Sequence, residues 1–237
     1  MICLVTDRRR LFGPDVGTDV GTDAAAHVPA GAWRACLVAQ IRHAVDAGID
    51  LIQVRERDLD AGELAALVTE LLAVTAGTRT RLVVNDRIDI ALACGADGVH
   101  LRGDSIPIPA ARRLAPPGFL IGRSVHGVDE AIGAAGADYL IAGTVYPSAS
   151  KPGPAPLLGI EGLRSIVKAV DRPVLAIGGI AGGRIDEVAA AGAAGFAAIG
   201  VFMASHADAE VAGCRVVELR QSVKYARSRF DRLNTTP

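Results

Sequence analysis

A serine and a histidine two residues apart in the stretch IGRSVHG, residues 121–127, have the types and spacing of a proton-transfer pair. Alternate residues of a β-strand point to the same side, so Ser124 and His126 are expected to share a face. An imidazole with a pKa of about 6.5 can take up and return a proton at neutral pH, a role that contributes about 10²–10⁴-fold in rate. We interpret His126 as the candidate catalytic residue and Ser124 as the group that orients it or binds the substrate. Taken alone, His126 has an equally good structural explanation.

Arginines alternate in the stretch QVRERD, which follows an apolar run. This spacing places Gln53, Arg55 and Arg57 on one face and indicates an anion site. Ion pairing of the two arginines with Glu56 or Asp58 is the structural alternative.

Two further polar positions follow later apolar runs. Asn85 and Asp86 are an ordinary helix N-cap pair when taken by themselves, although Asn85 is also a candidate for substrate binding. His100 is more simply explained as a hydrogen-bonded wall histidine than as a catalytic group.

Small and hydroxylic residues later in the chain have the chemistry of phosphate binding. Paired glycines after an apolar run leave backbone N–H groups open to an anion, and hydroxyls with a lysine add donors and a point charge. The candidates for the first phosphate are Gly178, Gly179, Gly200 and Val201, and those for a second phosphate or a pyrophosphate are Ser148, Ser150 and Lys151.

A near-repeat supplies the elements that would position these residues. The segments AVDAGIDLIQV, ALACGADGVHL, AAGADYLIAG and AAAGAAGFAAIG each run from an alanine-rich stretch through glycine into an apolar strand. Glycine ends a helix in the left-handed conformation, and a continuously apolar strand is buried on both faces. The pattern predicts strands at 2–6, 49–54, 81–84, 98–101, 119–122, 138–142, 173–177 and 196–199. It predicts helices at 32–47, 61–75, 87–94, 107–115, 127–136, 161–170, 183–191 and 208–229.

Eight such units predict one α/β domain over residues 1–237, a closed (β/α)₈ TIM barrel with its site at the carboxyl ends of the strands. An open, doubly wound sheet is the alternative. We interpret residues 8–31 as a flexible loop after the first strand or a lid over the site, and 206–237 as a C-terminal helix and tail.

Composition limits the partners. Half of the 237 residues are hydrophobic and the net charge is −1, which argues against a nucleic-acid or acidic-membrane binder. We expect neither a leader nor a membrane span, and a cytoplasmic location. The four dispersed cysteines, with no C-x-x-C pair, are interpreted as buried small hydrophobic residues in a reducing compartment.

Several motifs together resemble one known family. The segments QVRER, VNDRIDIALACGADGVHL, IGRSVH, YPSASKPG, LLGIEGL, AIGGI and AAIGVF look like the thiamine phosphate synthase/TenI superfamily over about residues 1–205. The resemblance implies a (β/α)₈ barrel that acts on a small phosphorylated heterocycle, a thiazole phosphate, and a homodimer is expected from it.

The superfamily contains two chemistries. The synthase joins hydroxymethylpyrimidine pyrophosphate to thiazole phosphate with Mg²⁺ and releases pyrophosphate, for which the resemblance implies Asp86 and Asp104 as metal ligands. The match to the synthase pattern is incomplete. Arg57 stands where the pattern has a lysine, and Gly200 stands where it has a serine. HLRGDS stands where the pattern has HVGQ-x-D, so Asp104 falls one residue early. PSASK matches the pyrophosphate loop of the synthase.

The TenI branch includes a thiazole tautomerase, which moves a proton without a cofactor or metal and in which the histidine matching His126 is the proposed acid–base. RER and IGRSVHG resemble this branch, and we place the tautomerase slightly ahead of the synthase. A non-catalytic binder of thiazole phosphate or thiamine phosphate is the third hypothesis.

Overall fold

Eight parallel strands close into a barrel in the order β1 to β8, each paired with the next and β8 paired with β1. The structure is a computed structural model that describes residues 1–12, 32–148, 156–202, 209–211, 214–216 and 219–233. The strands are β1 (Ile2–Val5), β2 (Leu51–Val54), β3 (Arg81–Asn85), β4 (Gly98–Leu101), β5 (Leu120–Val125), β6 (Tyr139–Gly143), β7 (Val174–Ile177) and β8 (Gly195–Ala198). The predicted (β/α)₈ barrel is confirmed, and the open sheet is excluded.

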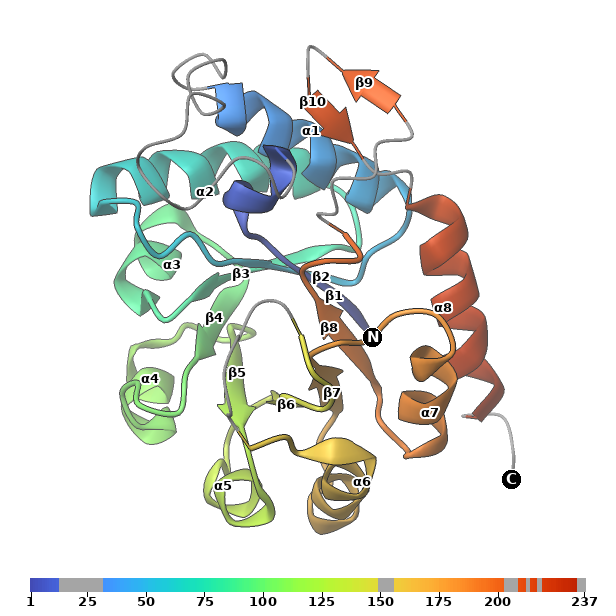
Figure 1. The fold of residues 1–237 in the computed structure, drawn as a ribbon. Coiled ribbons are helices and arrows are strands. Elements are labelled where there is room, and N and C mark those ends of the chain that lie inside the picture. The colour runs from blue at the N-terminus through green and yellow to red at the C-terminus, as the bar shows by residue number, and fades with distance from the viewer. Residues whose placement is uncertain (13–31, 149–155, 203–208, 212–213, 217–218, 234–237) are drawn as a thin grey trace.

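Helices surround the barrel on the outside (Figure 1). They are α1 (Ala32–Asp46), α2 (Ala61–Thr75), α3 (Ile88–Cys94), α4 (Ile108–Leu114), α5 (Val128–Gly133), α6 (Gly159–Ala169), α7 (Arg184–Ala190) and α8 (Arg220–Leu233), with a short 3₁₀ helix η1 (Arg8–Phe12) after β1. Within these described residues, no helix is both long and apolar enough to cross a membrane.

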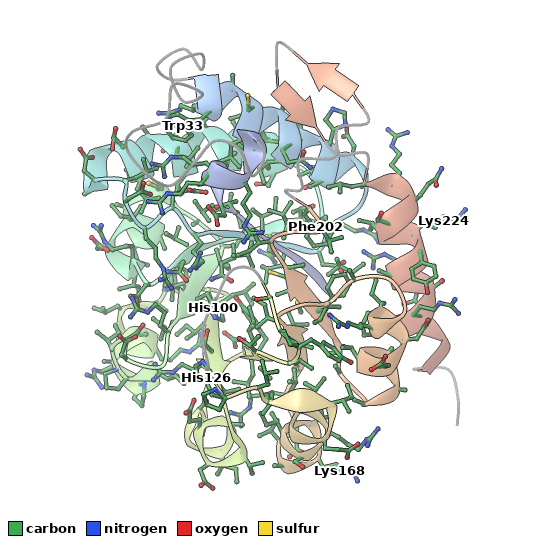
Figure 2. All side chains as sticks on the ribbon, in the orientation of Figure 1. Trp33, His100, His126, Lys168, Phe202 and Lys224 are labelled. Atoms are coloured by element: carbon green, nitrogen blue, oxygen red, sulfur yellow. The ribbon has the colours of Figure 1, made fainter. Side chains whose placement is uncertain are left out.

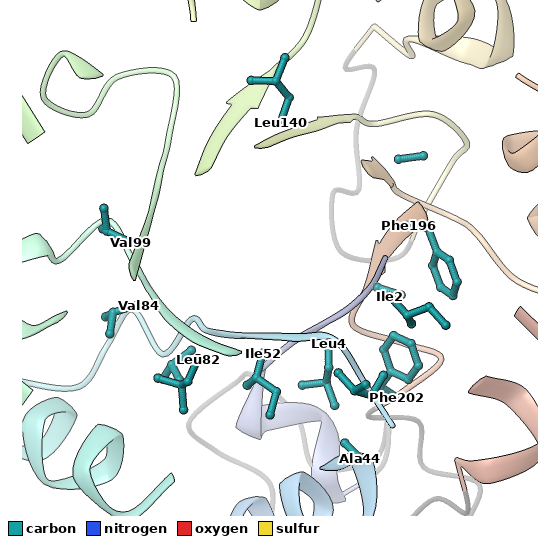
Figure 3. Packing of buried hydrophobic residues seen from close by; sticks show 14 of the residues in the cluster. Ile2, Leu4, Ala44, Ile52, Leu82, Val84, Val99, Leu140, Phe196 and Phe202 are labelled. Atoms are coloured by element: carbon teal, nitrogen blue, oxygen red, sulfur yellow. The ribbon is translucent and has the colours of Figure 1, made fainter. Parts of the chain in front are cut away.

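The core has two parts because each strand is buried on both faces. Side chains on the outer face, among them Ile52, Val99 and Leu140, point away from the barrel axis toward the helices (Figure 3). A smaller cluster fills the barrel interior and consists of Cys3, Val5, Leu51, Val83, Tyr139, Ile141, Leu175 and Ala197. These side chains fill the interior below the carboxyl ends of the strands, so we expect a ligand to enter from the carboxyl end.

Local sequence signals set the helix ends. Asp60 and Glu63 form a reciprocal capping box at the start of α2, which satisfies two backbone donors. Gly95 ends α3 with a φ of 71°, the left-handed conformation that the repeat pattern predicts. These signals fix where α2 begins and where α3 ends, and with them the positions of the strands and loops that carry the polar residues at the carboxyl end of the barrel.

The structure corrects four expectations. β5 continues to Val125, three residues farther than predicted. The predicted helix over 208–229 is wrong in its first half, where β9 (Ala209–Val211) and β10 (Cys214–Val216) form an antiparallel pair beside α1 before α8 begins (Figure 1). Residues 8–12 of the expected 8–31 loop are the helix η1, and 13–31 lie outside the described residues. Cys36 is disulfide-bonded, which contradicts its interpretation as a simple buried thiol, whereas Cys3 and Cys94 are free.

Candidate functional site

A cavity of about 530 Å³ opens at the carboxyl ends of the strands. It is lined by eleven of the residues that the sequence singles out: Gln53, Arg55, Arg57, Asn85, Ser124, His126, Ser148, Gly178, Gly179, Gly200 and Val201. Ser150 and Lys151 lie outside the described part of the chain. The structure therefore brings together residues from six of the eight strands or the loops that follow them.

Paired polar side chains form the floor of this cavity. Gln53 at β2 donates from Nε2 to Asn85 Oδ1 at β3, 2.8 Å away, and Gln53 is almost fully buried. The β3–β4 register pairs Asn85 with His100, so the polar layer continues onto the next strand. Buried polar groups need such partners, because an unpaired amide in the interior is costly.

His100 is the centre of a three-residue chain of hydrogen bonds. Its Nε2 lies 2.8 Å from Ser124 Oγ, and its Nδ1 lies 3.2 Å from the Tyr139 hydroxyl. Burial lowers the pKa of His100 to about 3, and the charge of Arg123 adds to this effect. The ring is therefore neutral at pH 7, with one nitrogen donating and the other accepting.

Glycine at position 122 makes this arrangement possible. A Cβ atom at Gly122 would lie 2.2 Å from Tyr139 Cζ and 2.5 Å from His100 Nδ1. The expectation that Ser124 orients His126 is wrong, because the Ser124 hydroxyl contacts His100 instead. The interpretation of His100 as a hydrogen-bonded wall residue is correct, but the residue also lines the cavity.

His126 lies just beyond the end of β5, where its side chain is 50% exposed. Figure 2 labels His100 and His126 on the side of the barrel that carries β5. The backbone N–H of His126 donates to Glu130 Oε2 at 2.9 Å, and its Nδ1 lies 3.2 Å from the same oxygen. Glu130 engages Nδ1, and His126 lines the cavity, an arrangement compatible with an oriented acid–base histidine.

Arg55 and Arg57 make no salt bridge to a carboxylate within the described residues. Glu56 and Asp58 bind Arg8 of η1 instead, at 3.1 Å and 2.6 Å, so the ion-pairing alternative for the two arginines is wrong. Burial lowers the pKa of Arg55, and repulsion from Arg57 contributes.

Arg10 and Arg102 also line the cavity, and no aspartate or glutamate is among the described residues that line it. Arg10 pairs with Asp7 at 3.6 Å, and Arg102 pairs with Asp86 and Asp104. The guanidinium groups of Arg55 and Arg57 are therefore the ones that indicate an anion site.

The glycine pair after β7 closes the opposite wall. Gly178 and Gly179 have φ values of 104° and 63°, which L side chains rarely adopt. Cβ atoms there would lie 2.4 Å from Thr144 Cγ2 and 2.4 Å from the Pro147 carbonyl oxygen. In the described residues neither glycine donates its N–H to a backbone carbonyl, so both donors are available to a ligand in the cavity.

The two aspartates implied as metal ligands are both paired with an arginine in the structure. Asp86, with a φ of 63°, accepts a hydrogen bond from the Ser105 hydroxyl and lies 3.5 Å from Arg102 Nη1. The other end of the Arg102 guanidinium binds Asp104, whose side chain is 70% exposed. Neither aspartate lines the cavity, and no cluster of three or more His, Cys, Asp or Glu suited to a metal occurs among the described residues. A guanidinium thus occupies the space between the two candidate ligands.

Sequence reasoning missed Arg10 and Arg102. Arg10 lies on η1, inside the segment interpreted as a loop, and its Nη1 is 3.9 Å from the position of a Cβ at Gly200. Arg102 directly follows β4, and this position after a strand was the available signal.

Fold and site together define a (β/α)₈ barrel with a cationic cavity and a glycine-lined phosphate wall. The family described as thiamine monophosphate synthase (TMP-TENI) matches residues 26–202. The chain belongs to this family, which confirms the resemblance and makes it an enzyme of thiamine biosynthesis.

Curated relatives are named thiamine-phosphate synthase. That of Methanoregula boonei is 47% identical over 160 residues, covering 67% of this chain and 74% of the relative. That of Anaeromyxobacter dehalogenans is 41% identical over 194 residues, covering 80% and 86%. A solved structure described as thiamine phosphate pyrophosphorylase from Pyrococcus furiosus superposes with a TM-score of 0.74 at 31% identity, covering 98% of this chain and 96% of that one. These names support the synthase over the tautomerase that the sequence placed first.

Proposed function

We propose that the chain is a thiamine-phosphate synthase, which joins a hydroxymethylpyrimidine pyrophosphate to a thiazole phosphate. In this reaction the bond between the pyrimidine methylene and the pyrophosphate oxygen breaks, and its electron pair leaves with pyrophosphate. The thiazole nitrogen then supplies the electron pair of the new C–N bond. Relatives of this name, at 41–47% identity, support the proposal.

The observation that carries the proposal is the charge of the cavity wall. Arg10, Arg55, Arg57 and Arg102 line it, and Arg55 and Arg57 make no salt bridge to a carboxylate among the described residues. The substrates together carry three phosphoryl groups, and fixed cations can stabilise the charge that develops on the departing pyrophosphate. Guanidinium groups suit phosphate oxygens because they donate in pairs.

The other walls fit the remaining groups of the substrates. The open N–H groups of Gly178 and Gly179 suit the phosphate of the thiazole, and Arg10 near Gly200 adds a charge there. The Gln53–Asn85 pair and Ser124 offer polar atoms at the floor, where a heterocycle would sit edge-on. Bound in this order, the thiazole nitrogen lies between its own phosphate site and the arginines.

Incubation with both substrates tests the proposal, with thiamine phosphate as the product measured. An Arg55→Met variant should lower kcat/KM about tenfold or more, since a hydrogen bond to a charged group contributes about 1.5–3 kcal/mol. Arg81→Met is the matched control, because Arg81 pairs with Asp97 at the start of β3, outside the cavity. Absence of thiamine phosphate from the wild-type reaction would contradict the proposal.

A thiazole tautomerase is the second candidate, favoured by one observation. His126 lines the cavity with its Nδ1 against Glu130, as an acid–base histidine would. His126→Gln should then abolish isomerisation of a carboxythiazole phosphate and leave phosphate binding nearly intact. A non-catalytic binder, the third candidate, would show thermal stabilisation by thiazole phosphate with no turnover of either substrate.

A further inference from the structure

Arg102 stands between two carboxylates at the carboxyl end of β4. Its Nη1 lies 3.5 Å from Asp86 Oδ2, and its Nη2 binds Asp104 Oδ2. Its backbone N–H donates to Ser105 Oγ at 2.7 Å. The side chain is thus held at both ends while remaining 39% exposed toward the cavity that it lines.

Asp86 is engaged by the same loop. The Ser105 hydroxyl donates to Asp86 Oδ1, and the Asp86 backbone N–H donates to the His100 carbonyl at 2.9 Å. Ser105 stands one residue beyond Asp104, where the family pattern has its second acidic residue. In the family pattern, a carboxylate at this position would share a cation with Asp86. Here the Ser105 hydroxyl stands in its place and donates to Asp86, so one of the negative charges that a divalent ion needs is missing.

An anion in the cavity therefore meets the guanidinium and not the carboxylates. Arg102 lines the cavity, and Asp86 and Asp104 do not. Arg102 makes the smallest contribution to the lowered pKa of Arg55, after burial, the repulsion from Arg57 and the opposing attraction of Asp7 and Glu56. An anion bound among these guanidinium groups would reduce their mutual repulsion.

We propose that the Arg102 guanidinium supplies the positive charge that a divalent cation would otherwise supply to the departing pyrophosphate, so that pyrophosphate release by this chain needs no metal. The inference rests on the proposed synthase function. The electron pair of the breaking C–O bond leaves on the pyrophosphate oxygen, and Arg102, Arg55 and Arg57 balance the charge that develops there. A guanidinium keeps its charge at all physiological pH values and holds phosphate oxygens in a fixed fork.

Binding of inorganic pyrophosphate, measured by calorimetry in EDTA and again in excess Mg²⁺, tests the inference without turnover. The wild-type protein should bind in EDTA with an affinity within about threefold of that in Mg²⁺. Arg102→Met should weaken binding in EDTA at least tenfold. Arg87→Met is the matched control, because Arg87 is equally exposed at 39%, pairs with Asp89 and lies outside the cavity lining.

Turnover under the same two conditions separates the inference from the function on which it rests. Thiamine phosphate formed at similar rates in EDTA and in Mg²⁺ supports both. Product formed only with Mg²⁺ overturns the inference and leaves the synthase standing. If no product forms under either condition, the synthase proposal fails. If pyrophosphate binding also requires Mg²⁺, the proposed role of Arg102 is overturned as well.

A rebuilt carboxylate pair gives a second readout. Arg102→Gly combined with Ser105→Asp removes the guanidinium and restores two acidic residues beside the cavity. This double variant should bind Mn²⁺ measurably by electron paramagnetic resonance at concentrations where the wild type binds none. Equal Mn²⁺ binding by the wild-type protein would show that Arg102 does not displace a cation.

Discussion

His100 Nε2 and Ser124 Oγ lie 2.8 Å apart across the β4–β5 pair, so a residue of the barrel core holds a hydroxyl at the cavity floor. The imidazole in turn is held by Tyr139, which is fully buried among apolar side chains. Because a neutral ring donates from one nitrogen only, the hydroxyl at one end sets the hydrogen-bond direction at the other. The orientation of the Ser124 hydroxyl at the cavity floor therefore depends on how Tyr139 packs in the barrel interior.

Tyr139→Phe should lower the free energy of unfolding by about 1–3 kcal/mol, because it keeps the ring but leaves His100 Nδ1 without a partner in the interior. Urea denaturation measures the change. Tyr225→Phe is the control, since its exposed hydroxyl donates to Asp186 on the surface at 3.0 Å. Equal effects of the two substitutions would mean that the buried hydrogen bond contributes no more to stability than the exposed one.

Acid should destabilise the protein through His100. The folded pKa of about 3 lies below the unfolded value of about 6.5, because burial disfavours the charged ring. Between these two pH values His100 is protonated in the unfolded state and neutral in the folded state. The free energy of unfolding therefore falls as the pH drops below 6.5, by about 1.4 kcal/mol per pH unit where His100 is fully protonated in the unfolded state and fully neutral in the folded state.

His100→Asn should remove this part of the pH dependence, as measured by urea titrations between pH 7 and pH 4. His43→Asn, on the outer helix α1, is the control and should leave the slope unchanged. A slope that persists in the His100 variant would place the acid sensitivity elsewhere.

Gly179→Ala should weaken binding of a phosphate monoester at least tenfold. The new Cβ would lie 2.4 Å from the Pro147 carbonyl oxygen, so the loop after β7 or the loop after β6 must shift away from the cavity. Gly182→Ala is the matched control, because Gly182 also has a positive φ, 54°, but has no atom within 4 Å of a Cβ and does not line the cavity. Calorimetry with phosphate compares the two, and equal losses would attribute the effect to backbone strain alone.

Arg8→Met should destabilise the protein by about 3–5 kcal/mol at neutral pH, because it leaves the buried Glu56 carboxylate without its cationic partner, with only the backbone N–H of residue 8 and the Thr6 side chain as donors. The Glu56 side chain is 2% exposed, and burial already raises its pKa. Because the pKa of Glu56 is raised in the folded state, stability is lost as the pH rises above the pKa of Glu56 in the unfolded state. The stability loss caused by Arg8→Met should therefore shrink toward pH 4.

Two variants test this explanation by chemical denaturation. Adding Glu56→Gln to Arg8→Met should restore most of the lost stability, since no buried charge remains. Arg9→Met should cost less than about 1 kcal/mol, because Arg9 is 60% exposed and its pair with Asp58 is a surface one. Failure of the double variant to recover would point to the stacking of Arg8 on Trp33 instead.

The barrel could be predicted from the sequence because its signals are local. A glycine that stops a helix, followed by an apolar strand, fixes an element within a few residues, and β4 begins and ends where predicted. The first half of the 208–229 helix was wrong because β9 and β10 are three-residue strands beside α1, and no periodicity shows in so short a segment.

The site could be predicted as a set of residues but not as a set of contacts. Alternation shows which face Ser124 occupies, yet its partner is set by the β4–β5 register, which pairs His100 with Gly122. The direction of Arg102 depends on Asp86, 16 residues earlier in the chain. Such long-range pairings have no signature in a single sequence.

The polar layer of Gln53, Asn85, His100 and Ser124 is at once the floor of the cavity and the roof of the barrel core. A substitution there alters catalysis and folding together, so laboratory evolution toward a new substrate would meet a stability threshold at these positions first. Variation should accumulate instead in the loops above the strands, where a changed side chain does not disturb the interior. A library confined to those loops is the efficient route to altered specificity.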